Sequence, residues 1–394
     1  MVIKPDKLAL RHVGQLFEAD VTFGDLTVFV GPQATGKSIF LQFLKLVVDA
    51  PAILNEFRRF NIDWQGRLEH FLELYFGEGM SGIWSDQSTI AADELRVDLK
   101  SLLKPGRKKK DEKLFFIPAQ RVMSVRDGLT RPFTDYRSGD PFVLREFSEQ
   151  LHRMMQSEFG QRRELFPQTK RLKSELRELI EEHIFGGFKL QADSESFQRR
   201  ITLNKNHNHA GKGKNLPYLV WSAGQREFVP LLLGFYWLMP PARISRRNTL
   251  EWVVIEELEM GLHPDAITAV LALVLELLHR GYRVCLSTHS PHVLDVVWAL
   301  SLIQRNQGDV QDALDLFGLR RSTVTLPLAR TALMLQARAY AFGRDGRVRD
   351  ISTLDPASED IWEAGWGGLT GFSAKVGDIV ARVVSQTAHQ EAMP

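Results

Sequence analysis

The hydrophobic pattern of the first fifty residues predicts a hairpin, a buried strand and a helix. Residues 8–23 alternate apolar and polar side chains, as the strands of an antiparallel hairpin do. A continuous apolar run at 26–30 (LTVFV) is typical of a short strand that is buried on both faces. Large apolar residues at helical spacing over 38–50 then predict a helix, so a strand leads through a glycine-rich turn into a helix.

A second series of strands and helices begins in the middle of the chain. Residues 114–121 (LFFIPAQR) return to a buried strand, and residues 224–239 are apolar with a helical pattern. The runs at 252–255 (WVVI) and 283–287 (RVCLS) predict two more buried strands, with a helix at 266–279 between them. Strand, helix and strand in this order indicate a parallel crossover unit.

The remaining segments have weaker patterns. Residues 52–111 mix aromatic-rich helical pieces with a strand-like stretch, and residues 141–185 indicate helices with interleaved acids and bases. Strands joined by a polar, basic loop are expected around 204–215. Near the end, residues 337–352 predict a hairpin around Gly-Arg-Asp-Gly, and a helix is expected near 374–386.

Composition places the chain among folded soluble proteins. Of its 394 residues, 44% are hydrophobic and 25% charged, and 50 Lys and Arg nearly balance 48 Asp and Glu, so no overall charge favours nucleic acid or an acidic membrane. A single cysteine, Cys285, excludes an internal disulfide, and the N-terminal residues lack the apolar region of a secretion signal. The apolar stretches at 229–242 and 266–278 are too short or interrupted to span a bilayer. We therefore expect a cytoplasmic protein without a membrane partner.

A phosphate-binding loop is the strongest chemical signal. The pattern G-x-x-x-x-G-K-[ST] is matched by Gly31, Pro32, Gln33, Ala34, Thr35, Gly36, Lys37 and Ser38. It lies between a buried strand and a helix, the context that a P-loop requires. Its backbone N–H groups are expected to cradle the phosphates of ATP, with Lys37 on the outer phosphates and the Ser38 hydroxyl on Mg²⁺.

Two acids end the strand at 252–255. Glu256 and Glu257 occupy the place of a Walker B element, and their side chains point to opposite faces because they are adjacent in a strand. Glu256 is expected near Mg²⁺, and Glu257 is expected to polarise the attacking water. Taken alone, two acids at a strand end are more often a solvated terminus, and the P-loop upstream is what favours the catalytic interpretation.

Two further candidates follow the same order along the chain. Ser222, Ala223, Gly224 and Gln225 open a helix and form a candidate anion-binding turn, although Ser222 could equally be a plain N-cap. His289 follows the strand at 283–287, so it emerges at the sheet edge where α/β proteins bind ligands. The nearby His263 and His292 compete for that interpretation, and only position in the motif order favours His289.

The series GPQATGKS, SAGQREF, WVVIEELEMGLHP and CLSTHSPH resembles the P-loop, signature, Walker B and switch-histidine motifs of ABC-type ATPases. Within that class it is most similar to the heads of OLD-like and related bacterial defence or toxin-system ATPases, relatives of SMC, RecF and Rad50 heads. The resemblance implies an α/β P-loop NTPase fold with an antiparallel β subdomain and a helical insertion. The expected divisions are an ATPase core at 1–50 and 114–300, a mixed insertion at 51–113, a helical insertion with a basic hairpin at 139–215, and a small C-terminal α/β appendage at 301–394.

The resemblance also implies a mechanism. Two subunits would sandwich ATP and Mg²⁺, each P-loop facing the signature of the other subunit. The implied roles are catalysis by Glu257 and His289, metal binding by Ser38, Glu256 and Gln120, and nucleotide contact in trans by Ser222, Ala223, Gly224 and Gln225. The sequence departs from the common pattern at Glu256, where many ABC ATPases have Asp, and at Ala223, which replaces a glycine.

These features lead to an expected function and one main alternative. We expect an ATPase that dimerises, or forms a higher homo-oligomer, on ATP and controls a separate effector in bacterial anti-phage defence. An OLD nuclease would carry a C-terminal Toprim domain, and the last ninety residues show no Asp-x-Asp array, so no nuclease activity is expected. The alternative is a DNA-repair or DNA-structure ATPase of the RecF or SMC kind, and a transporter ATPase is a distant third.

Two basic segments bear on that alternative. Residues 104–113 and 199–214 are rich in Lys and Arg and could contact DNA phosphates without reading sequence. Solvated hairpin tips explain such segments more often, and neither one contains aromatic residues that could stack on bases.

Overall fold

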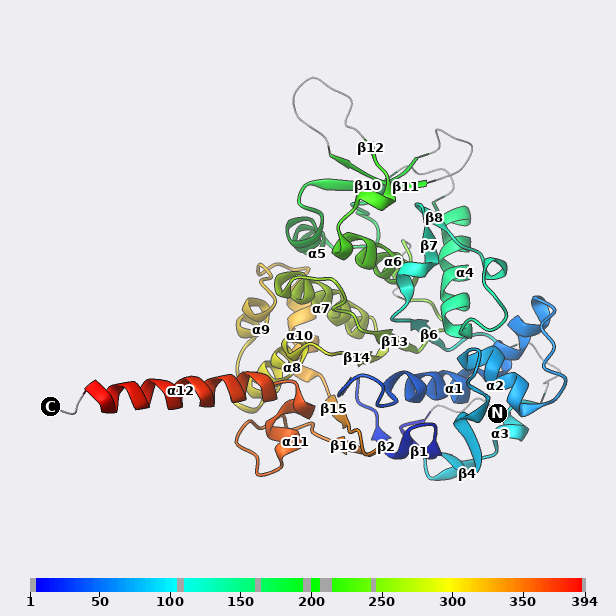
Figure 1. Cartoon of the computed structure of the whole chain (residues 1–394). Helices are drawn as coiled ribbons and strands as arrows, with labels where there is room; N and C mark the ends of the chain where they lie inside the picture. Colours follow the sequence, from blue (N-terminus) through cyan, green and yellow to red (C-terminus); the bar gives the residue numbers. More distant parts are fainter. Residues whose placement is uncertain are drawn as a thin grey trace, which may run out of the picture.

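The computed structural model describes residues 5–104, 110–159, 164–193, 200–205, 215–241 and 246–391, with side chains described as far as residue 384. Its centre is a six-stranded sheet in the order β16-β15-β3-β14-β13-β6. The strands are β3 (Leu26–Val30), β6 (Leu114–Ile117), β13 (Trp252–Glu256), β14 (Arg283–Ser287), β15 (Ala337–Phe342) and β16 (Val348–Asp350). All neighbours pair in parallel except β15 and β16. The α/β P-loop fold expected from the sequence is confirmed (Figure 1).

Both faces of the central sheet are buried. Val253 and Ile255 of β13 belong to one hydrophobic core, and Trp252 and Val254 belong to the other. The first core contains side chains of α4 (Phe142–Ser157), α6 (Ala223–Leu238), α7 (Pro264–His279) and α8 (Pro291–Arg305), and the second contains those of α1 (Lys37–Arg59). Alternate residues of each strand therefore face opposite layers, which explains why these strands read as continuous apolar runs.

An antiparallel sheet packs beside α1. Its order is β2-β1-β4-β5, and it confirms the predicted N-terminal hairpin. The elements of this region are β1 (Lys7–Val13), β2 (Leu16–Thr22), α2 (Leu68–Phe76), η1 (Ser81–Ile83), β4 (Trp84–Ala92), β5 (Leu95–Val97) and α3 (Leu99–Leu102). Helix α1 continues past Pro51 with a local kink at Asp49, so the expected domain boundary at residue 50 falls inside a helix. Segment 51–113 then supplies two strands to the sheet that the N-terminus begins.

A second antiparallel sheet, in the order β12-β11-β10-β9, lies beyond α5 and α6 at the top of Figure 1. The middle region comprises η2 (Arg121–Ser124), β7 (Val125–Arg126), β8 (Leu129–Thr130), η3 (Phe133–Asp135), β9 (Glu164–Phe166), α5 (Ser174–Ile180), η4 (Glu181–Phe185), β10 (Phe188–Asp193), β11 (Arg200–Lys205), β12 (Asn215–Leu216) and η5 (Tyr218–Val220). Strand β9 interrupts the span at 141–185 that was expected to be helical. Of the two basic segments, residues 105–109, 199 and 206–214 lie outside the described residues.

The C-terminal segment is joined to the central sheet. Strand β15 pairs in parallel with β3, and the predicted hairpin of β15 and β16 is confirmed. The segment also contains α9 (Val310–Leu316), α10 (Leu326–Met334), α11 (Ile361–Ala364), η6 (Trp366–Gly368) and α12 (Gly371–Glu391). Residues 301–394 were expected as an appendage, and the structure instead builds two strands of the main sheet from them.

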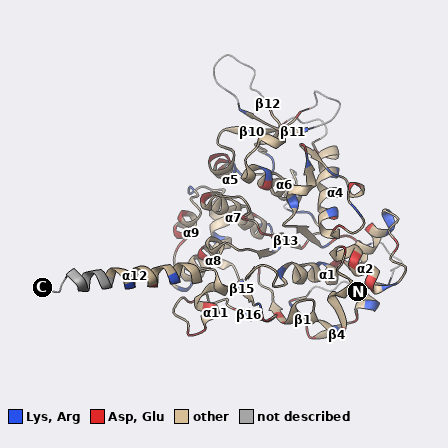
Figure 2. Cartoon of the chain, in the orientation of Figure 1, with Lys and Arg blue, Asp and Glu red and all other residues tan. Residues whose placement is uncertain are grey.

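The distribution of charged residues and the burial of the most apolar helix agree with the composition of a folded soluble protein. Lys and Arg are interspersed with Asp and Glu over the described chain, in keeping with the small net charge (Figure 2). Among the described residues, α1 is the one helix long and apolar enough to cross a membrane by length and composition. Because 83% of its most apolar window is buried inside the structure, α1 is a core helix.

A buried charge cluster ties α1 to the central sheet. The Lys45 side chain is fully buried, and its Nζ donates to Asp49 at 3.1 Å, to Glu112 at 2.6 Å and to the backbone carbonyl of Leu114 at 2.6 Å. Glu146 of α4 lies 3.1 Å from the same Nζ. Burial acts to lower the pKa of Lys45, and the surrounding carboxylates hold it well above its ordinary value. Burial also raises the pKa of Glu112 and of Glu146.

We predict that Lys45→Met lowers the free energy of unfolding by about 3–5 kcal/mol, because it leaves buried carboxylates without a cation. The loss should shrink as the pH falls from 7 towards 5, because the raised pKa values let Glu112 and Glu146 take up protons. Urea unfolding at pH 7 and at pH 5 measures this loss in the free energy of unfolding. Arg59→Met, which removes a half-exposed partner of Glu56, is the control and should cost less than about 1 kcal/mol. An equal loss in the two variants would contradict the prediction.

Candidate functional site

The turn between β3 and α1 has the backbone of a phosphate-binding loop. Gly31 and Gly36 adopt positive φ angles of 136° and 95°, where a side chain would be strained. A Cβ at Gly31 would lie 2.3 Å from the carbonyl oxygen of Phe342, and one at Gly36 would lie 2.6 Å from the Leu16 side chain. Among the described residues, no side chain caps the N-terminus of α1. Its first N–H groups therefore remain available to an anion.

Three of the predicted motifs meet at one cavity of about 280 Å³ beside this turn. P-loop residues Gln33, Ala34, Thr35, Gly36, Lys37 and Ser38 line it, together with Gln15, Ile39, Glu257, Ser287 and His289. The motifs meet because β3, β14 and β13 are parallel neighbours, so their carboxyl ends lie at one edge of the sheet.

Lys37 is held against the loop that precedes it. Its Nζ donates to the carbonyl oxygens of Gly31 and Pro32, both at 2.8 Å. Burial lowers the pKa of Lys37 to about 8, against the opposing effect of nearby carboxylates, chiefly Glu257 and Glu259. The lysine is thus a partly desolvated cation that, within the described part of the chain, donates hydrogen bonds to neutral carbonyls, which favours exchange of those carbonyls for phosphate oxygens.

Glu256 is buried at the end of β13, with 2% of its surface exposed. Its Oε2 accepts a hydrogen bond from the backbone N–H of Ala119 at 3.1 Å, and its Oε1 has no partner among the described residues. Burial raises the pKa of Glu256, and hydrogen bonds from Ser38 and Ala119 oppose this effect. An unpartnered carboxylate oxygen next to a serine hydroxyl is the oxygen donor set that Mg²⁺ takes in P-loop proteins, so these two residues fit the ion.

Glu257 faces the cavity from a strained position. Its φ of 45° lies in the left-handed region, and its N–H donates to the carbonyl oxygen of Ser287 at 2.8 Å. The Glu257 Oε1 lies 3.7 Å from Nε2 of His289. Burial lowers the pKa of His289, and the charge of Lys37 lowers it further, which favours the neutral form of this imidazole.

The two competing histidines lie elsewhere in the structure. His263 caps α7, where its Nδ1 accepts from the N–H of Asp265 at 3.4 Å. His292 forms a hydrogen bond between its Nε2 and the Thr268 hydroxyl at 2.7 Å. Neither residue lines the P-loop cavity, so the structure brings only His289 of the three to the predicted site.

The signature residues lie at the start of α6. Ser222 forms a capping box with Gln225, in which the Gln225 N–H donates to the Ser222 hydroxyl at 3.2 Å. A Cβ at Gly224 would lie 2.6 Å from the carbonyl oxygen of Gly261, so close packing requires a glycine there. Helix capping and packing therefore account locally for these residues. Ser222 and Ala223 are exposed, and no signature residue lines the P-loop cavity.

Gln120 was expected as a metal ligand, whereas the neighbouring Arg121 was not expected at the site. Gln120 is exposed and does not line the cavity, whereas the Arg121 side chain is fully buried. Arg121 donates to the backbone carbonyls of Glu256 at 2.8 Å and Glu257 at 2.9 Å, and its Nε donates to the carbonyl of Glu227 in α6 at 3.3 Å. Burial lowers the pKa of Arg121. The one signal in the sequence was an arginine in the short turn that follows the apolar strand β6.

Two more residues at the site carried no motif. Glu259 accepts a hydrogen bond from the backbone N–H of His289 at 2.6 Å, which fixes the loop after β14 to the loop after β13. Gln15 enters from the β1–β2 turn, where its Nε2 donates to the carbonyl of Ala34 at 3.3 Å. Their roles depend on contacts between segments far apart in the sequence, so periodicity and motif order could not reveal them.

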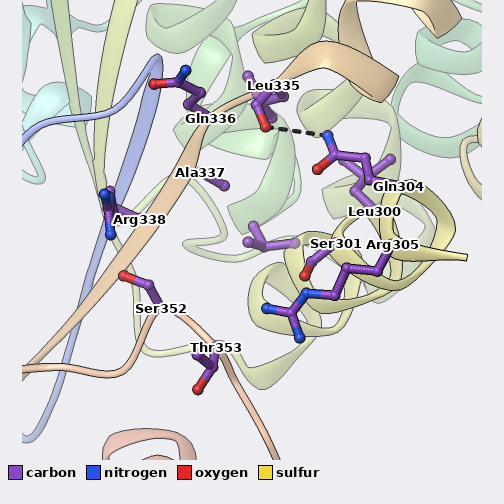
Figure 3. A pocket seen from close by; sticks show the side chains of 11 residues that line it. Leu300, Ser301, Gln304, Arg305, Leu335, Gln336, Ala337, Arg338, Ser352 and Thr353 are labelled. Atoms are coloured by element: carbon purple, nitrogen blue, oxygen red, sulfur yellow. Dashed lines mark hydrogen bonds between the residues drawn. The ribbon is translucent and has the colours of Figure 1, made fainter.

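A second cavity, of about 370 Å³, lies between α8 and β15 (Figure 3). Arg305 and Ser301 reach it from α8, while Ser352 and Thr353 face them from the segment after β16. Gln304 closes one end by donating to the carbonyl of Leu335 at 3.1 Å. None of the motif residues lines this cavity, so the chemistry of the P-loop site does not extend into it.

Comparison with known proteins agrees with the motifs. Residues 133–295 match the model of a family described as "AAA domain, putative AbiEii toxin, Type IV TA system", a segment that contains Glu256, Glu257 and His289. A search of curated proteins finds no match.

Two solved structures are similar to the chain. A structure described as "Crystal structure of the SmcHead bound to the C-winged helix domain of ScpA" has 10% identity and a TM-score of 0.42, over 88% of this chain and 96% of that chain. A structure described as "SMC head domain from Thermotoga maritima" has 14% identity and a TM-score of 0.31, over 74% of this chain and 92% of that chain. The P-loop that follows β3 and the match of residues 133–295 together show that this chain carries a P-loop ATPase domain, of which residues 133–295 are similar to the family so described.

Proposed function

We propose that this chain is an ATP-driven switch that closes as a dimer around ATP and thereby controls a separate effector protein. The convergence of the P-loop, Glu257 and His289 on one cavity carries the proposal. The signature turn at 222–225 supports the dimer, because Ser222 and Ala223 are exposed and the turn lies outside its own P-loop cavity, where it can face the nucleotide of a second subunit.

The geometry supports a division of labour in ATP hydrolysis. Lys37 would exchange its two carbonyl partners for phosphate oxygens, and the open N-terminus of α1 would bind the same phosphates. Glu257 would accept the proton of the attacking water, while neutral His289 would donate a hydrogen bond to the outer phosphate. Ser38 and Glu256 would hold Mg²⁺, which when bound supplies positive charge to the phosphates. Arg121 would keep both acids in place through their backbone carbonyls.

The matched family supports a biological setting for this switch. Its description names a putative toxin of a toxin–antitoxin system, and we therefore include a role in bacterial anti-phage defence in the proposal. In such a role the ATP-dependent closure is the signal, and the effector is the protein that responds to it. The segments at 105–109 and 206–214, which bear on the alternative DNA-binding role, lie outside the described residues. The effector-controlling switch is the function that the P-loop cavity supports best.

We predict that Lys37→Ala and Glu257→Gln separate ATP binding from hydrolysis. Loss of the Lys37 cation should weaken ATP binding roughly 10- to 100-fold, as expected for a charge-assisted hydrogen bond. Glu257→Gln should retain ATP affinity and lose roughly 10²- to 10⁴-fold in turnover, because the amide cannot accept the proton of water. Titration calorimetry and phosphate release measure the two effects.

Glu69→Gln, on the exposed surface of α2, is the matched control for the loss of one carboxylate and should leave both quantities unchanged. Normal turnover by Glu257→Gln would remove the assignment of Glu257 as the base. Unchanged ATP affinity of Lys37→Ala would show that the nucleotide binds elsewhere.

ATP affinity should depend on pH through Lys37. In the free protein its pKa is about 8, and bound phosphate raises that pKa, so the protonated lysine is the form that binds. Below pH 8 the lysine already carries its proton and affinity is highest. Above pH 8 binding must take up a proton, and affinity should fall up to tenfold per pH unit.

Calorimetry between pH 7 and pH 9.5, in buffers of different ionisation enthalpy, measures affinity and proton uptake together. Lys37→Arg is the control, because its guanidinium stays charged throughout that range and its affinity should not fall in the same way. Proton release on binding, or a wild-type profile as flat as that of Lys37→Arg, would contradict the pKa assigned to Lys37.

A shared site predicts complementation between two inactive variants. In a dimer of Lys37→Ala with Ser222→Arg, one site carries both lesions and the other is built from intact halves. Each variant alone should be nearly inactive. Coexpression with random pairing should restore up to about a quarter of wild-type turnover, provided that one site can act without its twin.

Glu257→Gln provides the accompanying physical measurement, because it should prolong the ATP-bound state. Its molecular mass, measured by light scattering with and without ATP, should rise on ATP binding. Coexpression of two Lys37→Ala chains is the negative control for recovery. If ATP adds no association to this variant and the mixed variants stay inactive, the sandwich mechanism is wrong for this chain.

A further inference from the structure

Helix α12 is anchored firmly at its base. Trp366, directly before it, is buried, and its indole N–H donates to the carbonyl of Leu354 at 3.2 Å. A Cβ at the neighbouring Gly367 would lie 2.8 Å from Val30 and 3.1 Å from Ala341. Val30 is the last residue of β3, so the base of α12 packs against the strand that leads into the P-loop. The segment that leads into α12 is therefore packed against the core.

Beyond this base, no described side chain of α12 is buried. Every residue from 371 to 384 is exposed, and the helix extends away from the rest of the molecule (Figure 1). Large apolar side chains are nevertheless frequent on it: Phe372 is 77% exposed, Val376 42%, Ile379 41%, Val380 54%, Val383 51% and Val384 62%. At about 100° per residue these six side chains occupy an arc of about 140° on one side of the helix.

The charged residues of the described part lie on the opposite side. Lys375, Asp378 and Arg382 follow one another at helical spacing, outside the apolar arc. The other residues between 371 and 384 carry no charge. The helix is therefore amphipathic, with an uncharged apolar face and a polar flank that carries both signs.

Such a helix is not stable in water by itself. It contains several β-branched valines and Gly377, which have low helix propensity, and isolated helices of this length are marginal even in favourable sequences. Most helices of this kind are stabilised by packing of the apolar face. The exposed apolar side chains of Phe372, Val376, Ile379, Val380 and Val384 accordingly favour a partner surface that covers them.

We propose that α12 is a docking helix that pairs with α12 of a second copy of this chain, without need for nucleotide. Two identical uncharged arcs are self-complementary under a two-fold axis. The flank carries charges of both signs, so it does not cause strong electrostatic repulsion between the two copies. The six side chains present on the order of 500 Å² of apolar surface per helix, so a pair buries about 1,000 Å², the size at which specific interfaces begin.

A second copy fits better than a lipid surface. Helices that lie on membranes carry a polar face rich in Lys and Arg, whereas the flank of α12 has only Lys375 and Arg382 on its described side chains, with Asp378 between them. The pairing is distinct from the ATP sandwich of the proposed function, because it uses no residue of the P-loop cavity.

Sedimentation of the Lys37→Ala chain without nucleotide tests the pairing, since the absence of ATP and the weakened ATP binding of this variant both disfavour the proposed ATP-linked dimer. We expect a dimer at micromolar concentration. Val380→Lys places a charge in the centre of the apolar arc and should weaken association at least tenfold. Ala374→Lys adds the same charge on the opposite side of the helix and should leave the dimer intact. A monomer in the parent chain, or equal association in both lysine variants, would overturn the proposal.

Site-specific crosslinking identifies the partner surface. The natural Cys285 is fully buried, so Val380→Cys introduces the one accessible thiol on the described residues. Treated with diamide as the oxidant, Val380→Cys should form a disulfide-linked dimer, while Ala374→Cys and the unaltered chain should not. Failure of Val380→Cys to crosslink above the level of Ala374→Cys would overturn the pairing of α12. Capture of a different protein by Val380→Cys would assign the face to a heterologous partner and would also overturn it.

Discussion

Burial of both faces of the central sheet is the constraint on which the rest of the structure depends. Strands that are covered on both sides must send alternate residues into two cores, as Trp252 and Val253 do on β13. Parallel pairing of β3, β14 and β13 then brings their carboxyl ends to one edge. The P-loop, the acids and His289 lie together because the two cores align the strands that carry them.

The edge of the sheet is then held by buried polar contacts. Arg121 hydrogen-bonds to the carbonyl oxygens of Glu256 and Glu257 and also to the backbone of α6. The acids of the site are thus connected to the helix whose exposed start carries the signature motif. A guanidinium buried at this point is costly unless its donors are satisfied, so the three carbonyl partners are strongly constrained in position. In the proposed switch, this contact would link the geometry of the acids to the position of the signature turn.

The proposed function and the proposed docking helix place two different demands on one chain. The nucleotide site uses charged groups around a small cavity, and its association would respond to ATP. Helix α12 uses an uncharged apolar face that projects from the body, and its association would persist without ATP. The base of α12 packs on the last residue of β3, so both features meet the core at the same strand.

The local elements around the site were determined by the sequence alone. The apolar runs at 26–30, 252–255 and 283–287 became β3, β13 and β14, and the glycines of the P-loop predicted the turn that the backbone adopts. These features depend on the period of side chains and on the conformational freedom of glycine, which are local properties. The fold class followed from the resemblance of the motif series to ABC-type ATPases, and the family match agrees with it.

Contacts between distant segments were decided only by the tertiary structure. Strand β15 joins β3 although more than 300 residues separate them, Arg121 is buried beneath two acids, and only one of three nearby histidines reaches the cavity. Parallel pairing leaves no signature in either strand, because any buried apolar strand can pair with any other. Burial of a charged residue, likewise, depends on partners that only folding brings within hydrogen-bonding distance.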